Sequence, residues 1–239
     1  MLNLTISSLM TSVGKFSQYK IKAAFVLLLL FLSACSPAPQ EFLRLSGMTM
    51  GTTYHITLRN PGDWTEASLK EALDKRLGAF NQIASTYIPD SELSQLNRMP
   101  AGEWRQLTPM LFDILVLSVE VSWLSNGAFD VTVGPLVDLW GFGPEKHDGS
   151  PDDAAVKKAL EEVGFGRIEL DMADHKLKKG APLRIDLSAV AKGYGVDAVA
   201  LWLESLGSTD YLVEIGGEMR VAGLSPRGDQ WRIGVESPD

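Results

Sequence analysis

The segment from Gly127 to Gly143, GAFDVTVGPLVDLWGFG, constrains the fold of this chain more than any other stretch. It combines four glycines and one proline with two phenylalanines, one tryptophan and two aspartates, and it contains no Lys, Arg, His or Cys. Glycines at this density let the backbone approach another group closely or adopt positive φ. Aromatic faces beside isolated carboxylates would suit a flat ring with polar substituents. A turn-rich crossing of the core has the same composition, so both interpretations stay open here.

The first 35 residues are typical of a secretory signal. Lys15, Lys20 and Lys22 precede the apolar run from Ala23 to Leu32, and small residues follow directly. The run is too short to span a bilayer as a helix. Its Leu-Ser-Ala-Cys ending resembles the bacterial lipobox, in which the cysteine, here Cys35, is lipidated and becomes the new N-terminus. The alternative is an ordinary cleaved signal followed by a spare cysteine.

We predict a signal segment over residues 1–35, a short tether over 36–41 and one domain over 42–239. Cys35 is the only cysteine in the chain, which therefore cannot form an internal disulfide. After residue 35 the chain has 19 basic and 30 acidic residues, a net charge of −11. This balance argues against nucleic acid and against a basic patch for anionic lipids. A lipid on Cys35 would instead provide the attachment to a membrane.

Hydrophobic spacing and turn residues predict an α+β fold. We expect two strands over 42–59 with breaks at Gly47 and Gly51, a hairpin over 167–179, and strands over 185–187, 211–215, 218–222 and 231–236. We expect helices that begin at a capping box of Ser68 with Glu71, at Thr108-Pro109, near 150–151 and near 188. Because strands outnumber crossover units, the helices should pack on a mostly antiparallel sheet.

The stretch from Ile185 to Asp197, IDLSAVAKGYGVD, is the second candidate for chemistry. A strand that leads into a helix presents free N–H groups and the positive end of the helix dipole, which favour a phosphate. Lys192 could add a charge-assisted contact. Asp186 would repel a bare phosphate and fits better on a hydroxyl, an amino group or a metal. The alternative makes Asp186 a helix cap and Lys192 a surface lysine.

Two shorter clusters and the histidines complete the candidates. Met50 lies in the run MTMGTTY, where methionine could contact an aromatic ring or belong to the core. Tyr87 ends the first expected helix and could stack on a ring or cover the core. The three histidines, His55, His147 and His175, are scattered and read as surface residues, and no CxxC or HxxxH spacing predicts a zinc site.

Taken together, these motifs resemble the ApbE family of FAD:protein FMN transferases, which are periplasmic flavin-transfer lipoproteins. The resemblance runs from about Phe42 to Asp239, with every motif in family order. It implies an ApbE-like single domain related to the T-fold. The motifs that carry it are MTMGTT at 48–53, STY at 85–87, the 127–143 segment, DLSAVAKGY at 186–194 and YLVEIGG at 211–217.

The resemblance also implies the ligands of individual residues. It assigns FAD contacts to a set drawn from four segments and a Mg²⁺ ligand to one backbone carbonyl, that of Ala189. It names no catalytic side chain within this sequence. The implied FAD contacts are Met50, Tyr87, Ala128, Phe129, Asp130, Asp186 and Lys192.

The implied reaction is a Mg²⁺-dependent transfer of FMN from FAD to a threonine hydroxyl of a target flavoprotein, with release of AMP. The implied acceptors are membrane-bound periplasmic flavoprotein subunits of redox pumps, and the implied location is the periplasm. Ser36 after the cysteine permits a lipid anchor in either membrane, and membrane-bound acceptors favour the inner one. Two alternatives stay open: an FAD-binding lipoprotein or FAD pyrophosphatase without transferase activity, and a structural lipoprotein with a vestigial site.

Members of the family continue well past the position of Asp239. The part that follows carries an Asp and a Thr that bind the magnesium and a His-x-x-Asp-Pro-x-Thr-Gly motif. We therefore expect this sequence to be C-terminally incomplete. Because one carbonyl cannot satisfy a hard cation that needs several oxygen ligands, we also expect the 239-residue chain by itself not to transfer FMN.

Overall fold

A computed structural model describes residues 41–144 and 149–235. The chain divides into two compact units, Met1–Glu41 and Phe42–Asp239, and the second contains the fold discussed below. The predicted signal segment, Cys35 and the tether up to residue 40 lie outside the described residues, as do His147 and the end of the chain after residue 235.

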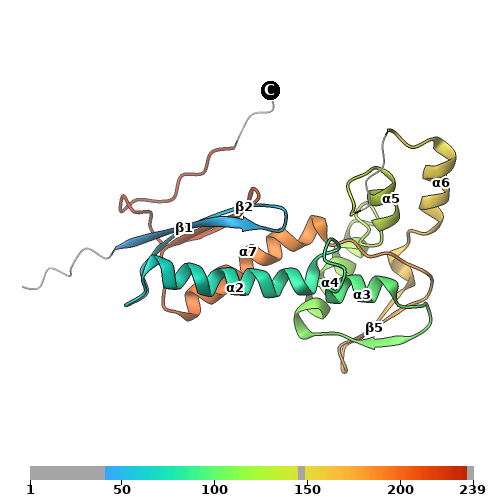
Figure 1. Cartoon of the computed structure of the whole chain (residues 1–239), viewed down its shortest axis with the longest axis horizontal. Coiled ribbons are helices and arrows are strands. Elements are labelled where there is room, and N and C mark those ends of the chain that lie inside the picture. The colour runs from blue at the N-terminus through green and yellow to red at the C-terminus, as the bar shows by residue number, and fades with distance from the viewer. Residues whose placement is uncertain (1–40, 145–148, 236–239) are drawn as a thin grey trace, which may run out of the picture. The chain divides into compact units, whose positions relative to one another are not determined.

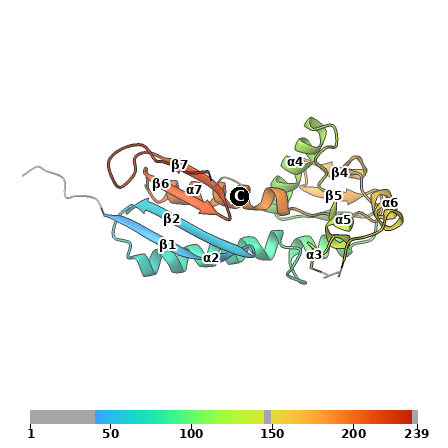
Figure 2. The same cartoon turned by 90° about the horizontal axis from the view of Figure 1, so that it is seen from above.

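A four-stranded antiparallel sheet in the order β1-β2-β6-β7 forms one part of the second unit. Neighbouring strands are joined by short turns or pair across the sequence, as β2 does with β6. Figures 1 and 2 show the helices α2 and α7 running along one face of this sheet. The bounds are β1 Phe42–Thr49, β2 Thr52–Arg59, β6 Tyr211–Ile215, β7 Glu218–Ala222, α2 Glu66–Ala84 and α7 Ser188–Ser205.

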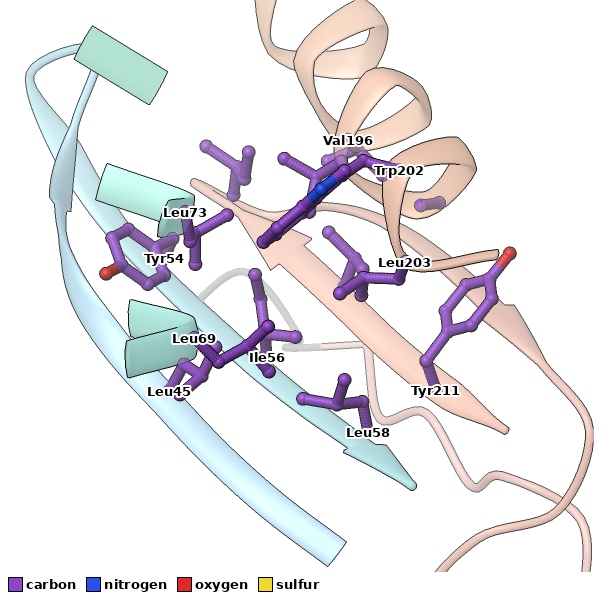
Figure 3. Close-up of a cluster of buried hydrophobic side chains, with 14 of the residues drawn as sticks. Leu45, Tyr54, Ile56, Leu58, Leu69, Leu73, Val196, Trp202, Leu203 and Tyr211 are labelled. Carbon is purple, nitrogen blue, oxygen red and sulfur yellow. The ribbon is translucent and has the colours of Figure 1, made fainter. Parts of the chain in front are cut away.

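Alternating residues of the strands build the first core, which we call the sheet core. Leu45, Ile56 and Leu58 point from the strands toward the helices (Figure 3). Leu73 of α2 and Leu203 of α7 meet them from the other side and are fully buried. The period-two and helical patterns of the sequence thus bury their apolar faces against each other.

A second core lies between α2, α4 and a three-stranded antiparallel sheet in the order β3-β5-β4. Phe112 and Leu115 of α4, Leu177 of β5 and Leu187 before α7 are buried in it. Among the described residues, no helix combines the length and the apolar character needed to cross a membrane. The remaining bounds are α3 Glu92–Arg98, β3 Trp104–Gln106, α4 Pro109–Leu124, α5 Gly134–Leu139, α6 Asp153–Glu161, η1 Phe165–Arg167, β4 Ile168–Asp171 and β5 Lys176–Lys179.

Helix boundaries agree with most of the sequence predictions and correct one of them. Thr108 caps α4 with Pro109 in the first turn, as predicted. The first long helix begins earlier than predicted, because Thr65 is its cap and Ser68 is the third-residue partner in the capping box. The short helices α3 and α5 were not predicted, since neither is long enough to show a clear period.

Strand predictions are confirmed in part. The hairpin β4–β5 and the strands β6 and β7 are confirmed. Gly47 does not break β1, since it pairs with Tyr54 inside the ladder. Residues 185–187 and 231–235 form no strand. The α+β class with helices on antiparallel strands is confirmed, although the strands form two sheets where one was expected.

Candidate functional site

Two segments singled out from the sequence lie side by side. The Asp186 backbone N–H donates to the Val131 carbonyl oxygen over 2.9 Å. Val133 forms an isolated parallel bridge with Arg184. The 127–143 segment therefore runs beside the stretch that leads into α7, and the tertiary structure brings these two candidates together.

The carboxylate of Asp130 is bonded within the protein. Its Oδ1 accepts from the Thr132 N–H (2.8 Å) and hydroxyl (2.6 Å), the local turn that Asp side chains favour. Its Oδ2 accepts from the Phe165 N–H over 3.0 Å. The Thr132 hydroxyl oxygen accepts in turn from the Gly164 N–H over 2.7 Å. Asp130 thus holds the loop in shape, in addition to the ligand contact that the family resemblance implies.

The aromatic residues of the 127–143 segment divide between the core and the surface. Phe129 packs against the second core, while its N–H donates to the Ser125 hydroxyl over 3.1 Å. Ala128 is exposed. Trp140 and Phe142 are exposed to 47% and 75%. Phe129 thus fits the core interpretation in part, whereas Trp140 and Phe142 present exposed rings.

Tyr87 contacts the end of this segment. Its hydroxyl donates to the Phe142 carbonyl oxygen over 2.5 Å, while its side chain stays 60% exposed. The neighbouring turn is further held by an ion pair between Asp138 and Arg184. Gly143 is required there, because a Cβ would collide with the Asp138 carboxylate. The ring of Tyr87 therefore presents a free face while its hydroxyl anchors the turn.

Asp186 lies at the start of α7 and is buried. Its Oδ1 accepts from the Ser188 N–H over 2.8 Å, so it uses one of the free N–H groups of the first turn. This contact matches the helix-cap interpretation in kind, although Leu187 is the cap residue. Asp186 is thereby held rigidly at the edge of the helix start.

Met50 and Lys192 connect the first half of α7 to two turns of the four-stranded sheet. Met50 adopts φ +50° in the β1–β2 turn and packs against both cores. Its Sδ–Cε end lies over Gly195, where a Cβ would come within 2.6 Å of Cε. The Lys192 Nζ donates to the Gly216 carbonyl oxygen over 3.3 Å in the β6–β7 turn. Three of the predicted residues, Met50, Asp186 and Lys192, thus lie at the N-terminal half of α7.

A match to a family model covers most of the chain. The model of the ApbE family matches residues 50–239. The chain belongs to the ApbE family. All of the candidate residues except Cys35 fall inside the matched range.

Relatives of this ApbE chain carry a name that states an activity. The FAD:protein FMN transferase of Vibrio cholerae is 41% identical over 88% of this chain and 63% of its own length. That of Haemophilus influenzae is 40% identical over 89% of this chain and 63% of its own length. The chain therefore spans less than two thirds of these two relatives.

Solved ApbE structures have the same fold. The flavin transferase ApbE from Vibrio cholerae superimposes with a TM-score of 0.79 at 41% identity, over 84% of this chain and 65% of that one. The ApbE protein from Thermotoga maritima gives 0.74 at 25% identity, over 82% and 64%. The α+β architecture described above is thus that of ApbE flavin transferases.

The residues present do not make up a magnesium site. Ala189 is exposed in the first turn of α7, as a backbone ligand would need to be. Over residues 41–144 and 149–235, however, no three or more His, Cys, Asp or Glu side chains gather as metal ligands would. Mg²⁺ takes six oxygen ligands in octahedral geometry, several of which are commonly water or substrate phosphate, and the described part of this ApbE chain shows no carboxylate cluster to complete them.

Sequence reasoning missed three polar residues and misplaced one histidine. Asn97 bonds to Ile185 and Lys179 bonds to Leu183 in the stretch that leads into α7, and Arg184 of that stretch pairs with Asp138. Lys179 had a signal, because period-two alternation puts it on the same face of β5 as Leu177. Burial lowers the pKa of this Lys179 ammonium. His55 is exposed as predicted, but His175 is half-buried and stacks on Phe112 at 4.9 Å.

Proposed function

We propose that this chain provides the FAD-binding portion of an FAD:protein FMN transferase. The observation that carries the proposal is the combination of 41% identity to the Vibrio cholerae transferase with a common fold at a TM-score of 0.79. Three candidate residues support it, because Asp186 and Lys192 lie in the first turns of α7 or directly before them and Met50 packs over Gly195 of the same helix. Since the chain spans 63% of that relative, the activity is proposed for the protein as a whole.

Each part of the site suits one part of FAD. The free ring face of Tyr87 would take the flat isoalloxazine, with Met50 as a soft contact. The Lys192 ammonium would bind the pyrophosphate, because the Ser188, Val190 and Ala191 N–H groups at the start of α7 already donate within the protein. Asp186 would accept from a hydroxyl or amino group of the ligand. These residues bind and orient FAD, and the proposal assigns none of them to proton transfer.

The proposed reaction is a phosphoryl transfer. The oxygen of an acceptor threonine bonds to the phosphorus on the FMN side of the pyrophosphate, the bond to the bridging oxygen breaks, and AMP leaves. The threonine proton is lost to solvent or to a base. Binding that holds the pyrophosphate in line with the acceptor supplies the positioning part of such catalysis.

The proposed reaction requires Mg²⁺, although the described residues show no cluster of side chains that would bind it. We call a protein that also includes the family's C-terminal part the extended protein. We expect FMN transfer by the extended protein to stop with a chelator and to return when Mg²⁺ is added. FAD binding by the 239-residue chain should respond less to the chelator than transfer does. Full transfer in the presence of chelator would contradict the proposed requirement.

Equilibrium titration with FAD tests binding directly. Flavin fluorescence quenching on addition of the 239-residue protein should saturate, and Tyr87→Ala should weaken it. Incubation of the extended protein with FAD, Mg²⁺ and a threonine-bearing acceptor domain should yield a fluorescent acceptor band on a denaturing gel. Release of AMP and free FMN without a labelled acceptor would identify a pyrophosphatase instead. Absence of any flavin binding would indicate a vestigial site.

We also propose that the protein is a lipoprotein anchored through Cys35 to the periplasmic side of the inner membrane. The support is the Leu-Ser-Ala-Cys ending of the basic and apolar leader. Acceptors there would be membrane-bound flavoprotein subunits of redox pumps. Cys35→Ser should release the protein from membrane fractions or leave its precursor uncleaved. Normal processing with unchanged membrane retention would contradict the anchor.

A further inference from the structure

A single side-chain amide bonds twice to the backbone that leads into α7. The Asn97 Nδ2 of α3 donates to the Ile185 carbonyl oxygen over 2.8 Å. The Asn97 Oδ1 accepts from the Ile185 N–H, also over 2.8 Å. The Asn97 amide thus makes the two hydrogen bonds that a neighbouring strand would make with Ile185. The N–H and C=O of Ile185 are therefore satisfied without a β-ladder.

A buried ammonium holds the backbone of the same asparagine. The Lys179 Nζ donates to the Asn97 carbonyl oxygen (2.9 Å) and to the Leu183 carbonyl oxygen (3.3 Å). Lys179 is only 1% exposed. Burying a lysine ammonium costs free energy unless its N–H donors are used. If this position needed only packing, a hydrophobic side chain would fill it at a lower cost.

The bonds to Ile185 also fix the backbone position of the next residue, Asp186. Successive N–H groups of an extended chain point to opposite sides. The Ile185 N–H accordingly faces Asn97, whereas the Asp186 N–H faces the Val131 carbonyl oxygen at 2.9 Å. The backbone of Asp186 is therefore clamped between α3 and the 127–143 segment, and its carboxylate bonds to the first turn of α7.

We propose that Asn97 is a positioning residue for the flavin site, which sets the backbone at Ile185 and thereby the place of the Asp186 carboxylate at the start of α7. This inference rests on the proposed function, because Asp186 is a ligand contact only if FAD binds there. Lys179 holds Asn97 in place by donating to the Asn97 carbonyl oxygen at the end of α3. Neither side chain needs to touch FAD for this role.

A double-mutant cycle tests the inference. FAD is titrated against the wild-type protein, Asn97→Ala, Asp186→Ala and the double variant, and thermal unfolding of each is recorded. We expect Asn97→Ala to weaken FAD binding about tenfold, because residues linked through one hydrogen-bonded network commonly couple on this scale. The double variant should bind as Asp186→Ala does, to within about twofold, because Asn97 acts through Asp186.

Ser208→Ala is the matched control. Ser208 is buried, and its hydroxyl donates to the Arg59 carbonyl oxygen over 3.0 Å across 149 positions. It follows the C-terminal end of α7, which is 18 residues long, about 27 Å from the helix start at 1.5 Å per residue. Ser208→Ala should lower the unfolding temperature and leave FAD affinity unchanged.

Unchanged FAD affinity in Asn97→Ala, or additive losses in the double variant, would overturn the inference while the proposed function stands. Failure of the wild-type protein to bind FAD would overturn the proposed function and the inference with it. If Asn97→Ala does not fold, Asn97→Asp takes its place in the cycle. It keeps the side-chain volume and the acceptor for the Ile185 N–H, but it sets a carboxylate oxygen against the Ile185 carbonyl oxygen in place of the donor. FAD binding should therefore weaken through Asp186 in this variant too.

Discussion

The strands of the sheet core are joined by backbone ladders, whereas the stretch between the second core and α7 is joined largely by side chains bonded to backbone. In the sheet, β2 pairs residue by residue with both β1 and β6. Beside α7, Asn97, Asp130 and Lys179 perform the same task one contact at a time.

This difference shows how a fold can keep a binding site open. A ladder satisfies every N–H and C=O of a strand and leaves none for a ligand. Side chains that bond to selected backbone groups hold an irregular path and leave the start of α7 and the face of Tyr87 accessible. Changes in the sheet core should therefore alter stability, and changes beside α7 should alter ligand binding.

The largest expected effect comes from the sheet core. Leu58→Ala removes a fully buried side chain and should lower the free energy of unfolding by about 2–5 kcal/mol. FAD affinity of the folded fraction should stay the same. Urea unfolding measures the first quantity and fluorescence titration the second. Leu117→Ala, at a 41% exposed position of α4, is the control and should change stability little.

Asp130→Ala should damage both properties. It removes three hydrogen bonds to a carboxylate and should cost about 2–3 kcal/mol of unfolding free energy. FAD affinity should fall as well, because the loop from 127 to 143 loses its tie to Phe165. Asp130→Asn keeps Oδ1 and should lose less in the same two measurements. A stable variant with full affinity would show that Asp130 does not shape the loop.

Asp186→Ala should separate binding from stability. Loss of a charged partner of the ligand costs on the order of 1.5–3 kcal/mol, or roughly ten- to a hundredfold in FAD affinity. Stability should fall by less than about 1 kcal/mol, since water can replace the bond to the Ser188 N–H. Titration calorimetry and urea unfolding measure the two effects. Equal dissociation constants would remove Asp186 from the site.

Tyr87→Phe should have a smaller effect than Tyr87→Ala. The phenylalanine keeps the ring face and loses only the bond to the Phe142 carbonyl, which is worth about 1 kcal/mol. FAD should bind several times more weakly to the phenylalanine variant and weaker still to the alanine variant. If both variants bind FAD equally, the hydroxyl and not the ring is the important part of Tyr87.

The smallest effect concerns pH and Lys179. Burial lowers the pKa of this lysine from its ordinary value of 10.5, so between the two values the unfolded chain binds more protons than the folded one. The free energy of unfolding should therefore rise with pH in that window by less than about 1.4 kcal/mol per unit. Relative to the wild type, Lys179→Met should lose stability as the pH rises toward 10. A constant difference between the two proteins would contradict the shift.

The sequence alone predicted the elements that depend on local signals. Thr108-Pro109 and the helix from Ser188 were identifiable because caps and periodicity act within a few residues. The strands Tyr211–Ile215 and Glu218–Ala222 were predicted with their observed bounds, because two glycines mark the turn between them. The family resemblance provided the candidate ligand residues, including Met50, which composition alone would have left in the core.

Only the tertiary structure decided how the site is held. Asn97 and Ile185 are separated by 88 positions, and no local pattern links an asparagine in a short helix to a distant backbone. The sequence leaves Phe129 open between a ligand wall and the core, and the structure packs it partly against the second core. Hydrophobic periodicity specifies which face of an element is buried, but it does not specify which distant polar groups satisfy an irregular backbone, because that depends on long-range packing.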